Sequence, residues 1–274
     1  MSETMGAGTP DKMLLAPGVL ISLKIILTHN RINRLFITTA EYFSRRHFAG
    51  LATTLVDPSR LTQLRPHPHS GLLASVVSFE GIEIPLQESF NILRRTRGGD
   101  TPLLVADYSH GGATGFPSLG SLNADIVCGE IGKWLLPPEL DFGLSFVWFR
   151  TERLRNHFAS AFAPFYLALP GRQTGNRAHW VSPQEVISTY KWMKEARVSR
   201  KKVLRCHQDN MVLGSEICSR YPCIAGSYSA LKVLGTMIRN AELRRFQQVG
   251  LLWNLGRGRT RVLCRTDVLN SLKR

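Results

Sequence analysis

The sequence predicts an α+β protein, with a ferredoxin-like N-terminal domain (β-α-β-β-α-β) and a second, basic, more helical α+β domain. Three observations support this prediction. Apolar runs and amphipathic segments alternate in that order through residues 19–108. A Gly/Ser/Pro-rich stretch follows at residues 109–140. Beyond it, residues 151–274 hold 22 of the 35 basic residues and only 7 of the 20 acidic ones.

The first two elements of the ferredoxin-like order are a strand and a helix. Residues 19–27, VLISLKIIL, are apolar and rich in β-branched side chains, which favours a strand. Residues 34–50 predict a helix, because Leu35, Ala40 and Phe43 can share one face that Gly50 closes.

The next four elements complete the order. Two apolar runs around the Glu80-Gly81 turn predict strands, a short amphipathic segment ending at two glycines predicts a helix, and a β-branched run predicts a final strand. In chain order these are 71–79, 81–87, 88–96 and 102–108. The predicted division of the chain is a disordered N-terminus at 1–18, the ferredoxin-like domain at 19–108, a linker or loop at 109–140 and the basic domain at 141–274.

The C-terminal part begins with an apolar strand at 142–149. A helix at 150–162 follows, with Leu154, Phe158 and Phe162 on one face. Ser182 and Pro183 have the types typical of a helix N-cap and first position. Another helix is expected at about 227–247, and residues 250–265 predict strand, hinge and strand.

Composition narrows the class of protein. The net charge of +15 favours a polyanionic partner, most simply nucleic acid, with an acidic protein face as the alternative. Five cysteines are an odd number in a long chain and do not suggest a disulfide framework, while zinc binding by Cys206, Cys218 and Cys223 is left open. No apolar run reaches the roughly 20 residues of a membrane span, so we expect a cytoplasmic protein without membrane contact.

The stretch GLLWNLGRGRTRVLCR near the C-terminus carries arginines at alternate positions. If the segment is extended, Arg257, Arg259 and Arg261 lie on one side, and Gly256 and Gly258 allow close backbone approach. Guanidinium groups suit phosphate oxygens, so the segment indicates phosphate binding. The alternative is a hairpin with a solvated basic edge.

The segments GLLWNLGRGRTRVL and VLISLKIIL, the latter with its following helix, give the chain a layout that resembles the RAMP superfamily of CRISPR proteins. The resemblance implies an RNA-binding component of a CRISPR ribonucleoprotein that holds guide RNA beside other effector-complex subunits. It also implies that the chain either cleaves the precursor repeat as a metal-independent endoribonuclease or only binds the RNA.

The resemblance and the charge pattern together give the candidate residues. His29 is the candidate catalytic base, because repeat-cleaving relatives often carry a histidine after the first strand. No cofactor or metal is expected. The alternatives are a DNA-binding protein of a plasmid or mobile element and a non-catalytic assembly subunit. The predicted RNA-binding residues are Gly256, Arg257, Gly258, Arg259, Arg261, Arg150, Arg153, Arg155, Arg200, Lys201, Lys202, Arg244 and Arg245.

Overall fold

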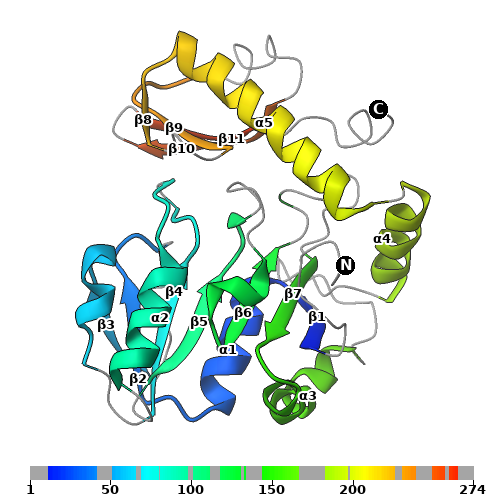
Figure 1. Ribbon diagram of the computed structural model, residues 1–274. Coiled ribbons are helices and arrows are strands. Elements are labelled where there is room, and N and C mark those ends of the chain that lie inside the picture. The colour runs from blue at the N-terminus through cyan, green and yellow to red at the C-terminus, as the bar shows by residue number, and fades with distance from the viewer. Residues whose placement is uncertain are drawn as a thin grey trace.

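A computed structural model of the chain shows two β-sheets, the larger built from the N-terminal half and the smaller from the C-terminal half (Figure 1). The second sheet and one long helix lie across one end of the first sheet. The structure describes residues 12–41, 51–65, 69–79, 81–97, 101–111, 118–130, 133, 144–166, 183–196, 198–225, 230–238, 249–256 and 259–264.

The larger sheet has seven strands in the order β1-β7-β6-β5-β4-β2-β3. The central strands are parallel, and β7 is antiparallel to both of its neighbours, β1 and β6. Because two reversals cancel, β1 runs in the same direction as β6. The strands are β1 (Met13–Pro17), β2 (Arg34–Thr38), β3 (Ala52–Val56), β4 (Ser70–Ser75), β5 (Leu103–Asp107), β6 (Ile126–Glu130) and β7 (Leu144–Phe149).

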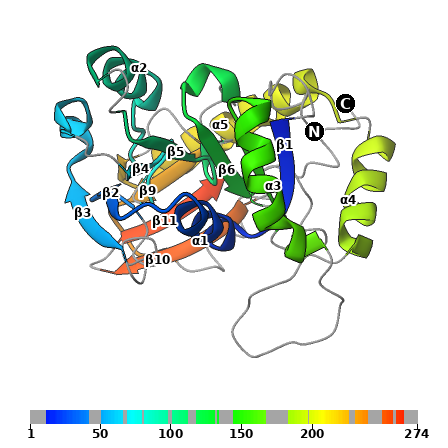
Figure 2. The same cartoon turned by 90° about the horizontal axis from the view of Figure 1, so that it is seen from below.

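Helices cover both faces of this sheet (Figure 2). The helices α1 (Val19–His29) and α3 (Glu152–Tyr166) pack on one face, and α2 (Leu86–Arg97) packs on the other. Successive residues of a strand point to opposite faces, so Val105 packs in the core under α1 and α3, and Leu104 packs in the core under α2. Burial on both faces is typical of parallel sheets and explains why these strands are apolar throughout.

The smaller sheet is antiparallel, with the order β10-β11-β9-β8. The long helix α5 covers one of its faces. A Cβ at Gly214 of α5 would come within 2.6 Å of Lys232 Cε on β9, so the helix packs closely on the sheet at this glycine. The elements are α4 (Pro183–Glu195), α5 (Arg200–Arg220), β8 (Cys223–Ala225), β9 (Leu231–Leu234), β10 (Val249–Gly256) and β11 (Arg259–Cys264). The short 3-10 helices η3 (Pro58–Gln63) and η6 (Leu119–Leu122) belong to the first half.

The observed architecture contradicts the predicted fold class. A ferredoxin-like domain has a four-stranded antiparallel sheet, whereas this chain builds a mostly parallel seven-stranded α/β sheet that takes β1 and β7 from outside residues 19–108. The predicted domain boundaries as such stay a prediction.

The first error lies in residues 19–27, which form most of α1 and not a strand. The buried positions Val19, Leu23, Ile26 and Leu27 follow helical spacing, and Gly18 precedes them with φ 72°. Burial against the sheet therefore outweighed the β-branched composition, because tertiary packing overrides a weak intrinsic preference.

Three further elements were assigned wrongly, and several were correct. The predicted strand at 81–87, within the described residues, is absent: Glu83 forms only an isolated bridge with Val77, and Leu86 already begins α2. Residues 34–38 form β2, not a helix, and residues 231–234 form β9 inside the expected helix at 227–247. The strands β4, β5 and β7 are confirmed, as are the helices α2, α3 and α4 and the β10–β11 hairpin. Among the described residues, no helix is long and apolar enough to cross a membrane.

Candidate functional site

The candidate site lies at the edge where the parallel strands end. Ligands of open α/β sheets bind outside the carboxyl ends of the strands, so the residues that directly follow β4, β5 and β6 are the first to consider. The smaller sheet and α5 face this edge and cover it (Figure 1). The covered edge therefore combines side chains from both sheets.

Asp107 is the last residue of β5 and is only 1% exposed. Its Oδ1 accepts a hydrogen bond of 2.8 Å from the Ser109 backbone N–H, and its carbonyl oxygen accepts one of 2.9 Å from the Val76 N–H. The second bond ties the end of β5 to the residue after β4. The carboxylate is thereby held in a fixed place at the covered edge.

Glu41, from the segment after β2, is a second buried carboxylate with 1% exposure. Its Oε1 accepts hydrogen bonds from Thr38 Oγ1 at 3.1 Å and from the Ser75 N–H at 2.5 Å. Its Oε2 accepts one from Ser75 Oγ at 2.5 Å. Glu41 thus joins the ends of β2 and β4.

Lys133 lies three residues beyond the end of β6, the strand next to β5. Its Nζ forms an ion pair of 2.5 Å with Glu130 Oε2, and both side chains are about one-fifth to one-quarter exposed. A primary amine and the Asp107 carboxylate thus follow adjacent parallel strands at the same edge.

The N-terminus of α1 lies at this edge as well. Pro17, the last residue of β1, pairs with Leu144, and Ser145 pairs with Glu130 at the end of β6. Gly18 then turns the chain into α1, with φ 72° and ψ 144° and without a side-chain cap. The first N–H groups of a helix have no intrahelical acceptor and attract anions.

Arg261 reaches this edge from β11 of the smaller sheet. It is 2% exposed, and its Nη1 donates a hydrogen bond of 2.9 Å to the carbonyl oxygen of Phe79, in the turn after β4. Its guanidinium carbon lies 3.9 Å from the centroid of the Phe79 ring. The buried guanidinium on the smaller sheet therefore contacts the turn after β4 of the larger sheet.

Tight packing supports the Asp107 segment. Burial raises the pKa of the Tyr108 hydroxyl, while the Arg200 guanidinium at the start of α5 opposes this shift. The Tyr108 ring lies edge-on to Phe146, with 6.1 Å between the centroids. A Cβ at Gly129 would come within 2.9 Å of the Phe146 ring, which keeps β6 close to these aromatic side chains.

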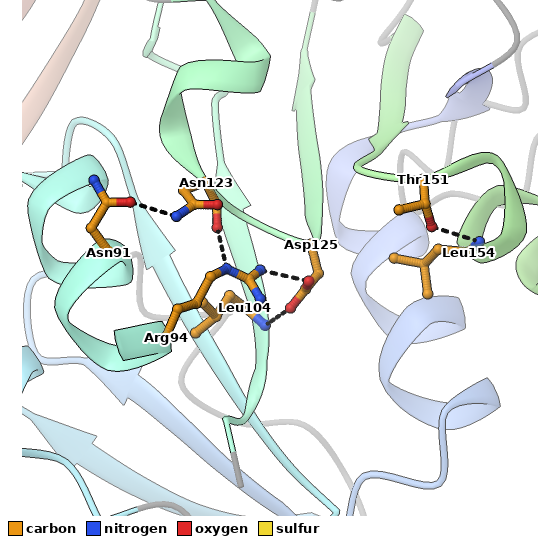
Figure 3. A network of polar contacts seen from close by, with 7 residues as sticks. All are labelled: Asn91, Arg94, Leu104, Asn123, Asp125, Thr151 and Leu154. Carbon is orange, nitrogen blue, oxygen red and sulfur yellow. Dashed lines mark hydrogen bonds and ion pairs between the residues drawn. The ribbon is translucent and has the colours of Figure 1, made fainter. Parts of the chain in front are cut away.

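A polar network holds the same strands at their opposite, amino ends (Figure 3). The Arg94 side chain on α2 donates to Asp125 Oδ1 at 2.6 Å and to the Asn123 carbonyl at 3.0 Å. Asp125 Oδ2 also accepts a hydrogen bond of 2.9 Å from the Leu104 N–H. The network fixes β5 and β6 relative to α2, far from the edge that carries Asp107.

The structure places His29 at the C-terminal end of α1, away from the covered edge. Its Nε2 donates a hydrogen bond of 3.0 Å to the His157 carbonyl oxygen, and the two imidazole centroids are 4.8 Å apart. The surrounding contacts join α1 to α3. They do not test the predicted role in catalysis.

The predicted RNA-binding residues do not form one surface. Arg150 follows β7 at the amino edge, where its N–H bonds the Asp125 carbonyl, and Arg153 and Arg155 follow it on α3. Another group begins α5, where Arg200 lies near Tyr108 at the other edge. That group is Arg200, Lys201 and Lys202.

The arginine-containing stretch at residues 250–265 is only partly within the described residues. Gly256 ends β10 opposite Arg259, which is half-buried, whereas Arg261 is buried against Phe79. Residues outside the described part are Arg257, Gly258, Arg244 and Arg245. The individual roles of the candidate residues stay predictions.

Metal binding finds no support in the part of the chain that the structure describes, where no three His, Cys, Asp or Glu residues are arranged to hold a metal ion. None of the five cysteines, including Cys206, Cys218 and Cys223, forms a disulfide. Burial raises the pKa of Cys218 to about 12, and its neighbour Cys223 contributes to this shift.

Comparison with known proteins assigns the fold. No protein-family model matches the chain, and no curated protein matches it. Three similar solved structures are the PLP-dependent cyclase OrfR, an aspartate aminotransferase of subgroup IV from Thermus thermophilus and an aspartate aminotransferase from Thermotoga maritima. Their TM-scores are 0.60, 0.60 and 0.57, with sequence identities of 15%, 14% and 10%.

The likeness extends over nearly the whole chain. The three comparisons cover 99%, 98% and 97% of this chain and 79%, 84% and 76% of the other chains. The chain therefore has the α/β fold of these PLP-dependent enzymes. At these identities the likeness shows the fold alone.

This fold overturns the resemblance to the RAMP superfamily. An RNA-binding CRISPR subunit, a repeat-cleaving endoribonuclease and guide RNA as partner were all inferred from a ferredoxin-like layout that the chain does not have. The two alternatives, a DNA-binding protein and an assembly subunit, are likewise unsupported. The physical origin of the error is the interpretation of α1 as a strand, which created the β-α-β-β-α-β order.

Sequence reasoning missed Asp107, Lys133 and Glu41. A usable signal was present for the first two, because Asp107 is the last residue of the apolar strand LLVAD and Lys133 lies three residues after the apolar strand IVCGE. Glu41 gave no such signal, since residues 34–50 were assigned to a helix.

Proposed function

We propose that this protein is a PLP-dependent enzyme that acts on the amino group of an amino acid. The observation that carries the proposal is the placement of Asp107 and Lys133 after adjacent parallel strands of a sheet whose fold is shared with PLP-dependent enzymes. A lysine amine and an acidic partner for the pyridine nitrogen are the two groups that such a cofactor requires.

The residues at the covered edge fit PLP by their chemistry. Lys133 offers a primary amine for the aldehyde, and Asp107 offers a buried carboxylate for the pyridinium nitrogen. The N-terminus of α1 after Gly18 offers backbone N–H groups for the phosphate. When bound, PLP supplies an electron sink for the carbanion that forms when a substrate bond is broken.

The other charged residues at the edge have roles that follow from their contacts. Glu130 Oε2, 2.5 Å from Lys133 Nζ, fixes the position of the amine at the edge. Ser109 fixes the Asp107 carboxylate through its N–H. Arg261 brings a buried guanidinium, whose geometry matches a carboxylate, and so supports an amino acid as substrate.

The names of the similar structures include both aminotransferases and a cyclase, so the proposal specifies the cofactor and the amino-acid class and not the subsequent reaction. A cytoplasmic location is part of the proposal. Five cysteines outside any disulfide support it, because thiols persist in a reducing compartment.

The test is covalent trapping of the cofactor. Purified protein is incubated with PLP, reduced with borohydride, digested and analysed by mass spectrometry. We expect a pyridoxyl adduct on the peptide that contains Lys133 and a visible absorption band before reduction. Lys133→Ala should abolish both, whereas Lys24→Ala, at an exposed position on α1, should leave them unchanged.

Asp107→Asn keeps the shape of the side chain and removes its negative charge. We expect weaker PLP binding by a factor of about 10 to 100, because a charge-assisted contact becomes a neutral one. An adduct spread over several surface lysines, or one that persists in Lys133→Ala, would contradict the proposal.

A further inference from the structure

The contact between Phe79 and Arg261 joins the two sheets at the candidate site through two separate interactions. The Phe79 carbonyl accepts one N–H of the guanidinium at 2.9 Å, and the Phe79 ring faces the guanidinium carbon at 3.9 Å. A ring attracts a cation through its quadrupole and does not act as a directed N–H acceptor of ordinary strength. The ring can therefore fix the position of the guanidinium and leave its planar donor pattern suited to a carboxylate.

The turn that carries Phe79 is itself firmly held. Ser78 is fully buried, and its N–H donates to the Ile82 carbonyl at 2.8 Å. The Ser78 Oγ in turn accepts the Ile82 N–H at 2.9 Å, and the Gly81 N–H donates to the Ser78 carbonyl at 3.1 Å. Three hydrogen bonds around one residue make the turn a rigid support for Phe79.

The same turn is connected to Asp107. Val76, at the start of the turn, donates its N–H to the Asp107 carbonyl at 2.9 Å and accepts the Ile84 N–H at 3.0 Å. The segment that supports Phe79 is therefore bonded directly to the residue that would face the pyridine nitrogen. A displacement of Arg261 changes where a substrate carboxylate lies relative to that residue.

From this connected geometry we propose that Phe79 is a positioning residue that determines the preference for substrates with a carboxylate, by holding Arg261 with its ring and its carbonyl. The inference rests on the proposed function. Phe79 does not take part in the chemistry. It acts through Arg261, so its loss should affect the recognition of the carboxylate and not the uptake of the cofactor.

The experiment compares ligands that differ only in the carboxylate. The PLP-loaded protein is titrated with each of the proteinogenic L-amino acids, and the shift of the cofactor absorption band is followed. The amino acid with the strongest response is then compared with its carboxamide. The preference is the ratio of the two dissociation constants, measured for the wild type, Phe79→Leu, Phe79→Tyr and Arg261→Gln.

Phe79→Leu retains the main-chain carbonyl and removes the aromatic face. We expect the preference for the acid over the amide to fall about tenfold in this variant, as lost cation–π contacts imply. Phe79→Tyr retains the aromatic face and should restore the preference to within about twofold. Arg261→Gln should reduce it about a hundredfold or more.

The outcomes separate this inference from the proposed function. An unchanged acid-to-amide ratio in Phe79→Leu, or equal binding of acid and amide by the wild type, overturns the inference while the PLP assignment stands. A wild-type protein that forms no PLP adduct overturns both. Thermal unfolding and PLP affinity are measured for every variant, and a loss of PLP binding in Phe79→Tyr would indicate a structural role and also overturn the inference.

Discussion

Removal of the Glu41 carboxylate should destabilise the protein strongly, because three donors depend on it. Glu41→Ala leaves Thr38 Oγ1, the Ser75 N–H and Ser75 Oγ without this acceptor at a site that is 1% exposed. A buried donor without a partner costs about 1–3 kcal/mol. The two hydroxyl groups can rotate toward other acceptors, but the backbone N–H cannot. We therefore expect a loss of about 3–5 kcal/mol in the free energy of unfolding.

Glu41→Gln is the matched variant. The amide oxygen can still accept the Ser75 N–H, and the amide nitrogen can donate to Ser75 Oγ, so the loss should be about 1–2 kcal/mol. The assay is urea denaturation, in which the midpoint urea concentration should fall while the dependence of the free energy of unfolding on urea concentration stays the same. Glu216→Ala, at an exposed position on α5, should stay within about 0.5 kcal/mol of the wild type. Equal losses for Ala and Gln, or a loss below about 1 kcal/mol for Ala, would refute the reasoning.

Two further predictions concern stability. Gly111→Ala should cost about 1–3 kcal/mol, because its Cβ would lie 2.5 Å from the buried Tyr108 ring; Gly120→Ala, whose Cβ meets only Ser118 Oγ at 3.9 Å, is the control, and equal melting temperatures would be inconsistent with this argument. Burial raises the pKa of Cys264 from 9.0 to about 12, while Lys232 opposes the shift. Since the unfolded thiol ionises above 9.0 and the folded one stays protonated, stability should fall between pH 9.0 and about 12, by up to about 1.4 kcal/mol per pH unit. Urea denaturation at several pH values should show that the free energy of unfolding falls less steeply with pH in Cys264→Ala than in the wild type. The same dependence on pH in both proteins would refute the assignment to Cys264.

The local sequence pattern was sufficient to predict elements with a clear helical spacing of apolar residues or with glycines between two apolar runs. The spacing of Leu154, Phe158 and Phe162 gave α3, and the two glycines between apolar runs gave the β10–β11 hairpin. The pattern failed at α1 and β2, because short apolar runs such as VLISLKIIL suit a buried strand and a buried helix equally. One exchange of helix and strand at residues 19–38 was enough to change the predicted fold class.

The candidate site was less accessible from sequence than the elements. Asp107 and Lys133 can be assigned to one site only when β5 and β6 are known to be adjacent and parallel. Strand order depends on contacts between distant parts of the chain, which the local sequence does not show. Arg261 was selected for its alternation with other arginines, which suggested an open basic face. Its burial against Phe79 depends on how the smaller sheet lies on the larger one, which no local pattern encodes.

The position of β7 between β1 and β6 has a consequence for how the chain is made. Among the described strands β1 pairs with β7 alone, so Met13–Pro17 emerges from the ribosome long before its partner at Leu144–Phe149 exists. Until then the edge of β6 is also unpaired, and contacts this distant in sequence form slowly. The nascent chain therefore carries β1 as an unpaired strand through the synthesis of more than a hundred residues, a period in which chaperone binding or aggregation competes with completion of the sheet.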